Sequence, residues 1–123
     1  MRTITISTGD ITLSAELNES GTAQTIWEAL PIAGRVNTWG EEIYFEIPVI
    51  MEQAPDARVE AEVGELGYWP TDHAFCIFFG PTPASVDETP RAISPINTFG
   101  KITDGAKTLR DVKDGEEIRI TKV

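Results

Sequence analysis

The sequence has few of the side chains that most often carry catalysis or bind metals. One cysteine and one histidine occur among its 123 residues. A lone cysteine forms no internal disulfide, and a lone histidine without further spaced ligands does not make a zinc site. A glycine-rich phosphate loop and the G-x-S-x-G motif of serine hydrolases are also absent. The sequence therefore predicts no metal and no cofactor, and it carries no signature of a catalytic site.

Basic residues are scarce as well. The chain has 10 Lys and Arg against 20 Asp and Glu, and its formal net charge at pH 7 is −10. Proteins that bind nucleic acids or anionic membranes use basic patches to reach phosphates. The acidic balance therefore predicts neither nucleic acid nor a membrane as a partner. An acidic protein-interaction domain that meets a basic partner stays open as one interpretation.

Long apolar stretches are missing too. The longest run, residues 74–79, is far shorter than the roughly 20 residues that span a bilayer. Residues 1–5 do not read as a signal peptide, because they lack its apolar core of roughly 7–15 residues. We therefore expect a cytoplasmic protein. Cys76 lies inside the apolar run, which predicts a buried structural thiol. A nucleophilic Cys76 would need a base, and His73, three residues away, faces the other side of a strand.

What the sequence does contain is a series of short alternating segments. Residues 3–7 and 11–17 alternate apolar and polar side chains around a Thr-Gly-Asp turn, which is typical of a β-hairpin. Residues 73–79 are apolar on both faces and predict a central strand covered on both sides. Residues 41–47 alternate and give two unlike faces, with Ile43, Phe45 and Ile47 on one and Glu42, Tyr44 and Glu46 on the other.

Helices and loops complete the predicted fold. Ser20 or Thr22 can cap a helix over residues 23–30, and a second short helix is expected over 106–112. Residues 68–72 predict a compact aromatic turn. Residues 84–95 predict a loop that either covers the outer face of the 73–79 strand or leaves a groove open there. About eight strands and two short helices favour one mainly β domain over residues 1–123, folded as a closed barrel because closure removes exposed strand edges.

Four motifs carry a resemblance to a known family. They are N-T-W-G-E-E-I-Y-F at 37–45, G-Y-W-P at 67–70, F-F-G-P-T-P at 78–83 and G-K-I at 100–102. In this order they resemble the small prokaryotic cyclophilin-like proteins, a family without an established function, and residues 97–112 resemble the C-terminal part of the cyclophilins. The resemblance covers nearly the whole chain. It implies a closed eight-stranded cyclophilin-like β-barrel with two short helices capping the ends.

The chain departs from the cyclophilins where they carry out prolyl isomerisation. Active cyclophilins carry F-H-R-x-x-x-x-F-x-x-Q-G-G, and their arginine donates hydrogen bonds to the twisted prolyl amide. The matching stretch here, residues 42–51, has neither the arginine nor Q-G-G, and Ile96 stands where a histidine precedes V-F-G. Glu and Tyr in place of this donor stabilise a rotated amide poorly. The resemblance therefore favours a domain without this activity, with a divergent peptidyl-prolyl cis-trans isomerase as the alternative.

The resemblance also places a candidate site, because cyclophilins bind their ligands on the outer surface of the barrel. We predict a module that binds a small molecule or a short peptide there. Three aromatic residues sit in or beside turns, where they either plug the barrel end or line a pocket: Trp39, Tyr68 and Trp69. In the alternative interpretation, Glu42 and Glu46 are solvated surface acids, and Asn37 and Asn97 form hydrogen bonds with backbone groups near turns. The predicted pocket residues are Asn37, Trp39, Glu42, Tyr44, Tyr68, Trp69, Ile77, Phe79 and Asn97.

Overall fold

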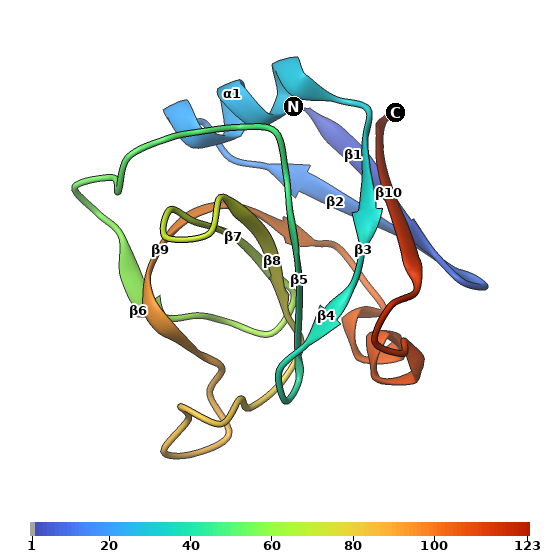
Figure 1. Ribbon diagram of the computed structural model, residues 1–123, viewed down its shortest axis with the longest axis vertical. Helices are drawn as coiled ribbons and strands as arrows, with labels where there is room; N and C mark the ends of the chain where they lie inside the picture. Colours follow the sequence, from blue (N-terminus) through green and yellow to red (C-terminus); the bar gives the residue numbers. More distant parts are fainter. Residues whose placement is uncertain (1) are drawn as a thin grey trace.

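The structure is a computed structural model that describes residues 2–123, and it is mainly β (Figure 1). Residues 2–123 form ten strands, one α-helix and one 3₁₀-helix. In chain order they are β1 Thr3–Thr8, β2 Ile11–Leu17, α1 Gly21–Ala29, β3 Ile32–Arg35, β4 Asn37–Thr38, β5 Glu42–Glu46, β6 Arg58–Glu60, β7 Glu65–Trp69, β8 Ala74–Phe78, β9 Arg91–Ile102, η1 Ala106–Asp111 and β10 Glu117–Lys122.

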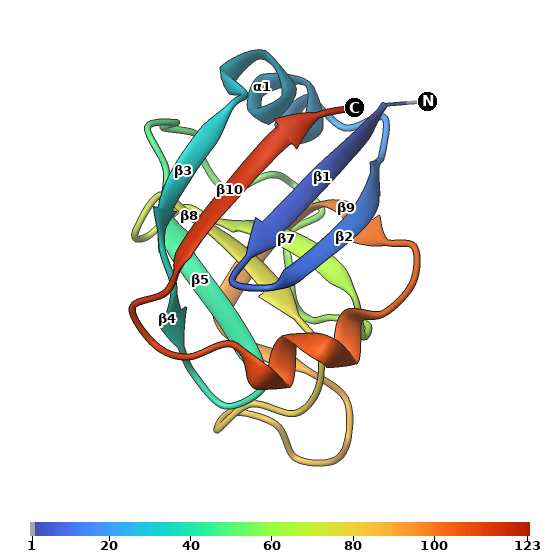
Figure 2. The same cartoon turned by 90° about the vertical axis from the view of Figure 1, so that its right-hand side faces the viewer.

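All ten strands belong to one antiparallel sheet that curls on itself (Figures 1 and 2). The strand order is β3-β10-β1-β2-β9-β7-β8-β5-β4, with β6 paired to β9 off this path. Within residues 2–123 the two end strands, β3 and β4, do not pair with each other. The expected closed eight-stranded barrel is therefore wrong: the sheet has ten strands and is not closed.

The ends of the sheet stay open for a simple geometric reason. β3 and β4 follow each other along the chain and are separated only by Val36, so they form one extended segment that cannot pair with itself. The first part of this segment pairs with β10, and the backbone N–H of Val36 donates to the carbonyl of Glu116 at 2.9 Å. The second part pairs with β5. Alternating side chains indicate the faces of a strand and do not indicate its neighbours, which is why the sequence did not predict this order.

The N-terminal hairpin is confirmed. β1 and β2 pair antiparallel with Ile6 opposite Leu13 and Thr5 opposite Ser14. Ile6 and Leu13 are buried, whereas Ser14 is exposed. The faces of β5 are also as expected, because Ile43 and Phe45 are buried in the main core. Period-two alternation thus predicted both segments correctly.

Two helices lie at opposite ends of the curled sheet (Figure 2). α1 covers the end near both termini, and the Ser20 hydroxyl accepts a hydrogen bond from the backbone N–H of Ala23 at 3.1 Å. Ser20 is therefore the N-cap, and the helix begins two residues before the predicted position. The second helix, η1, is a 3₁₀-helix held by the buried Leu109. No helix within residues 2–123 has the length and apolar character needed to cross a membrane.

Two predicted boundaries are wrong. Residues 68 and 69 belong to β7 rather than to the predicted turn, and β9 begins at Arg91, inside the predicted 84–95 loop. The early part of β9 pairs with β6, with Arg58 opposite Ile96 and a register shift before Glu60. Gly67 in β7 and Pro95 in β9 are unfavourable in regular strands, so their presence concealed these two elements.

The crossing of β6 and early β9 over the sheet divides the apolar side chains into two cores. The main core fills the inside of the curled sheet and includes Phe45, Phe75 and Phe99. A smaller outer cluster lies on the other face of β8, and it consists of Ala61, Ala74, Cys76, Phe78, Ala92 and Ile96. This arrangement explains why β8 is apolar on both faces, as the sequence predicted. Tyr44 and Trp69 pack against the edge of the outer cluster, where the candidate site lies.

Candidate functional site

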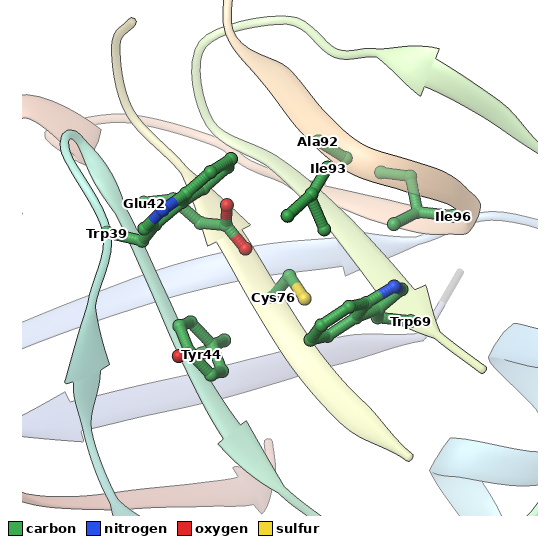
Figure 3. Close-up of a pocket in the computed structure, with 8 residues that line it drawn as sticks. All are labelled: Trp39, Glu42, Tyr44, Trp69, Cys76, Ala92, Ile93 and Ile96. Atoms are coloured by element: carbon green, nitrogen blue, oxygen red, sulfur yellow. The ribbon is translucent and has the colours of Figure 1, made fainter. Parts of the chain in front are cut away.

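A cavity of about 90 Å³ opens beside the outer cluster (Figure 3). It lies between β5 and β8 on one side and the early part of β9 on the other. Its walls are aromatic and aliphatic, with a single carboxyl group among them. The lining residues are Trp39, Glu42, Tyr44, Trp69, Cys76, Ala92, Ile93 and Ile96.

Strand register brings these side chains together. β5 and β8 pair antiparallel, with Tyr44 opposite Cys76 and Glu42 opposite Phe78. Because alternate residues share a face, Glu42 and Tyr44 both point outward from β5, and Cys76 points outward from β8. The backbone N–H of Trp39 donates to the backbone carbonyl of Glu42 at 2.9 Å. The Trp39 ring and the Glu42 carboxyl both line the cavity (Figure 3).

The far wall is held by Trp69 from the end of β7. Its ring meets Tyr44 edge to face, with centroids 6.2 Å apart and planes at 87°. Its indole Nε1–H donates to the Ser94 hydroxyl at 2.6 Å, which ties β7 to β9 across the outer cluster. Such a hydrogen bond satisfies the polar atom of the indole and leaves its ring available as an apolar wall.

Glu42 is the chemically notable group of the cavity. The residue is only 5% exposed. The ion pairs formed by residues 2–123 do not include its carboxylate. Burial raises the pKa of Glu42 from 4.5 to about 7, and a hydrogen bond with the Cys76 thiol lowers it in part. The carboxyl therefore exchanges its proton near neutral pH.

Cys76 is a buried thiol, as the sequence predicted. Burial raises the pKa of Cys76 well above its ordinary value, and the negative charge of Glu42 adds to this effect. The thiol therefore stays protonated at neutral pH and is a poor nucleophile. It lines the cavity, and its Sγ donates a weak hydrogen bond to the carbonyl of Ala74 at 4.0 Å.

A second depression adjoins the cavity on the other side of Tyr44. It has a volume of about 530 Å³, and its walls are more polar. Two carboxyl groups, those of Glu46 and Asp72, belong to it. We call it the acidic groove, and its lining residues are Asn37, Tyr44, Glu46, Thr71, Asp72, His73 and Ala74. Tyr44 separates the two spaces and belongs to both.

The structure brings together four of the nine residues that the sequence placed in a pocket. Trp39, Glu42, Tyr44 and Trp69 line the cavity, and Asn37 lies in the acidic groove. The signal that predicted Glu42 and Tyr44 was the outward face of β5, which the two side chains share. The remaining four predicted residues lie in the protein interior instead.

These four residues have structural roles. Ile77 and Phe79 point into the main core, because the opposite face of β8 carries Cys76 and Phe78. Tyr68 is fully buried, and its hydroxyl donates to the carbonyl of Val49 at 2.7 Å and accepts from the N–H of Met51 at 3.2 Å. Asn97 accepts from the N–H of Ala54 at 2.8 Å and donates to the carbonyl of Glu52 at 3.0 Å. Both polar side chains anchor residues 49–54.

Sequence reasoning missed four lining residues. They are Cys76, Ala92, Ile93 and Ile96. Period-two alternation put Cys76 on the face opposite Ile77, but only the β5–β8 register places it beside Tyr44. Ala92 and Ile93 carried no local signal, because the sequence predicted a loop over residues 84–95, and Ile96 follows directly after that loop. Their position depends on the long-range pairing of β6 with β9.

Residues 2–123 form no group of three or more His, Cys, Asp or Glu side chains arranged to hold a metal ion. The carboxyl groups of the cavity and the acidic groove therefore do not converge as a metal centre. The chemistry available at this site is that of one proton-exchanging carboxyl among aromatic rings, with further carboxyl groups nearby.

Comparison with known proteins agrees with this architecture. The family model described as Cyclophilin-like matches residues 2–121. The chain belongs to the cyclophilin-like family. The resemblance predicted from the sequence motifs is thereby confirmed. Among curated proteins, none matches the sequence.

Two solved structures share this cyclophilin-like fold. The hypothetical protein AF2241 from Archaeoglobus fulgidus, solved in solution, is 33% identical, with a TM-score of 0.83, 99% of this chain covered and 95% of that one. McbB, solved in complex with tryptophan, is 19% identical, with a TM-score of 0.74. The match covers 96% of this chain and 44% of McbB, so the chain spans less than half the length of McbB. At this identity the second likeness shows the fold alone.

Proposed function

We propose that this cyclophilin-like protein is a non-catalytic binding module, acting in the cytoplasm, that holds a small molecule or a short peptide on the outer face of its sheet. The observation that carries the proposal is the cavity of about 90 Å³ with the buried carboxyl of Glu42 among aromatic walls. A concave, mostly apolar site with one well-placed polar group is the usual form of a small-ligand site.

Energetics support a binding role for Glu42. A buried carboxyl without an ionic partner costs stability when it is ionised, because burial removes its hydration. An apolar residue at this position would fill the space next to Trp39 and Cys76 without that cost. A perturbed carboxyl inside a cavity is therefore better explained by a ligand that it contacts than by the stability of the fold.

The size of the two spaces suggests how a ligand lies. A cavity of about 90 Å³ holds only a few non-hydrogen atoms, whereas the acidic groove measures about 530 Å³. We place the terminal group of the ligand in the cavity and the rest of it in the groove, on either side of Tyr44. A small metabolite or a peptide side chain with its backbone fits this arrangement.

The same geometry weighs against prolyl isomerase activity. Isomerisation is accelerated by hydrogen-bond donors aimed at the rotated amide, and the arginine of active cyclophilins supplies them. The cavity here presents the carboxyl of Glu42, and its lining contains no Lys or Arg. A proton-exchanging carboxyl and a tyrosine hydroxyl are the polar groups available, and we assign them to binding.

Ligand-observed and protein-observed NMR titrations test the proposal. The probes are a set of short peptides, simple amines and carboxylates, and amino acids including tryptophan, which McbB holds in its solved structure. We expect at least one probe to shift the backbone amides of residues 39–46 and 74–78 in a saturable manner. Trp39→Ala should abolish these shifts.

The matched control is Trp27→Ala. Trp27 belongs to α1, its ring contacts the side chains of Arg2 and Lys122, and it lines neither the cavity nor the acidic groove. Its removal should leave the titration unchanged. The proposal is wrong if no probe in the set shifts the cavity amides, or if the shifts persist in Trp39→Ala.

A further inference from the structure

The charged groups around the cavity are all potential anions. Glu42 is the only carboxyl among the lining residues, and Glu46 and Asp72 follow in the acidic groove. The residues that line the cavity with Glu42 include no base: β8 contributes Cys76, β7 contributes Trp69, and the lining residues of β9 are aliphatic. His73 is the single basic residue among those that line the groove.

These negative charges affect the pKa of Tyr44, which lies between the cavity and the acidic groove. Burial raises the pKa of Tyr44, and the negative charges of Glu42, Asp72 and Asp114 raise it further. Three carboxylates from separate parts of the chain thus act on the same point. An anionic ligand would meet repulsion there, whereas a cation would be attracted along the whole path from groove to cavity.

The cavity walls suit a cation as well. The rings of Trp39, Tyr44 and Trp69 stand around the space into which the Glu42 carboxylate points, and Ile93 closes the other side (Figure 3). Aromatic faces attract ammonium groups through their quadrupole, and several rings around one carboxylate recognise methylated ammonium ions in particular. The aliphatic side chains of β9 would pack against the carbon atoms of such a group.

We infer that the ligand carries an alkylammonium group, and that this group binds in the cavity between the Glu42 carboxylate and the rings of Trp39, Tyr44 and Trp69. The inference rests on the proposed binding function and names its ligand class. A volume of about 90 Å³ admits an ammonium or methylated ammonium head with its first carbon atoms. The remainder of the ligand passes Tyr44 and lies in the acidic groove.

Binding of a cation is linked to the proton on Glu42. A positive group beside the carboxylate favours its ionised form, so the cation displaces the proton. Since the pKa of Glu42 in the free protein is about 7, affinity should be highest above pH 7 and fall as the pH decreases below it. A quaternary ammonium ion cannot lose its own charge, so its pH dependence reports on the protein alone.

Paired probes separate charge from shape. Choline is matched by its neutral analogue 3,3-dimethylbutan-1-ol, and butylammonium by butan-1-ol and butyrate. NMR titrations at constant ionic strength measure each dissociation constant at pH 8 and at pH 5.5. We expect one of the two cations to bind at least about tenfold more tightly than its neutral partner at pH 8. Its affinity should fall by about tenfold or more at pH 5.5.

Variants assign the effect to Glu42. Glu42→Gln should lower the affinity for the cation about tenfold and remove its dependence on pH, while binding of the neutral analogue stays the same. Glu16→Gln, on an exposed position of β2, changes the net charge equally and should have no effect. The pH dependence of the unmodified protein tests the inference even if Glu42→Gln does not fold.

The outcomes distinguish this inference from the proposed function. If the neutral analogues or butyrate bind the cavity as tightly as the cations, or if Glu42→Gln binds the cations unchanged, the alkylammonium inference is wrong and the binding function stands. The same holds if only ligands without a cationic group bind. If no probe in the wider set shifts the cavity amides, both fail together.

Discussion

Burial of Glu42 makes the stability of the folded protein depend on pH in a predictable direction. The pKa of this carboxyl is about 7 in the folded state and 4.5 in its ordinary state, so the folded protein holds a proton that the unfolded chain releases. The group therefore favours folding fully below pH 4.5, and this contribution is lost as the pH rises through 7. A carboxylate that an ion pair stabilises gives the opposite pH dependence: it favours folding at high pH.

We predict that the free energy of unfolding falls by about 3 kcal/mol between pH 4.5 and pH 8, relative to that of Glu42→Gln, because each pKa unit corresponds to about 1.4 kcal/mol. Urea denaturation of the two proteins over this pH range measures the difference. Comparison with Glu42→Gln cancels the contributions of the other carboxyl groups. Parallel stability curves for the two proteins would show that Glu42 is ionised normally in the folded state.

The thiol of Cys76 gives a second residue-scale prediction. It is buried against Glu42, and burial raises its pKa well above the ordinary value. Iodoacetamide reacts with thiolates, so we expect alkylation of the folded protein to be at least about a hundredfold slower than that of the unfolded chain in urea. Mass spectrometry follows the reaction. Equal rates in the two states would contradict the placement of Cys76 below the surface.

At the scale of elements, Gly67 determines how closely β7 and β9 approach each other. A β-carbon built on Gly67 would lie 2.4 Å from Cδ1 of Ile96. The two strands pair through Gly67 and Thr98, next to a register shift between Leu66 and Gly67. Ile96 also lines the cavity, so the same contact connects the packing of the sheet with the shape of the site.

We predict that Gly67→Ala destabilises the protein by about 1–3 kcal/mol, because the added methyl group overpacks this contact. Combination with Ile96→Val, which removes the nearest methyl group, should recover part of the loss. Gly21→Ala is the matched control, since a β-carbon at this helical position meets no atom within 4 Å. Thermal or urea denaturation measures all three. A Gly67→Ala protein as stable as Gly21→Ala would contradict the tight approach of the strands.

The element boundaries were predictable where the sequence carries regular local signals. Alternation predicted the β1–β2 hairpin and the faces of β5, and Ser20 predicted the start of α1 to within two residues. It failed at β7 and at the beginning of β9. Both contain a residue that regular strands disfavour, and both are strands because distant partners pair with them.

At the scale of the whole molecule, the fold and the activity of the cyclophilins are separable. The chain has the fold of the family, but its β5 segment and cavity carry Glu42 and Tyr44 rather than an arginine donor. A fold positions a site without determining its chemistry. The isomerase activity therefore has to be tested separately from the fold.

We predict that the protein does not accelerate cis-trans isomerisation of prolyl peptides above the uncatalysed rate, because the lining of the cavity has no arginine to stabilise the rotated amide. A protease-coupled assay with a proline-containing tetrapeptide measures this rate. An active cyclophilin at the same concentration is the positive control. Acceleration that disappears in Tyr44→Phe or Glu42→Gln would instead establish the divergent isomerase.

Taken alone, the sequence determined the acidic balance, the faces of several strands, the presence of α1 and the family, because these are properties of residues close together in the chain. It also predicted Trp39, Glu42, Tyr44 and Trp69 as pocket residues. The tertiary structure decided that the ten-stranded sheet stays open, that β9 covers the outer face of β8, and that Tyr68 and Asn97 are internal anchors. Strand pairing and the burial of a charge depend on segments far apart in the sequence. The Glu42 carboxyl lies in a cavity because β5, β8 and β9 come together only in the folded protein.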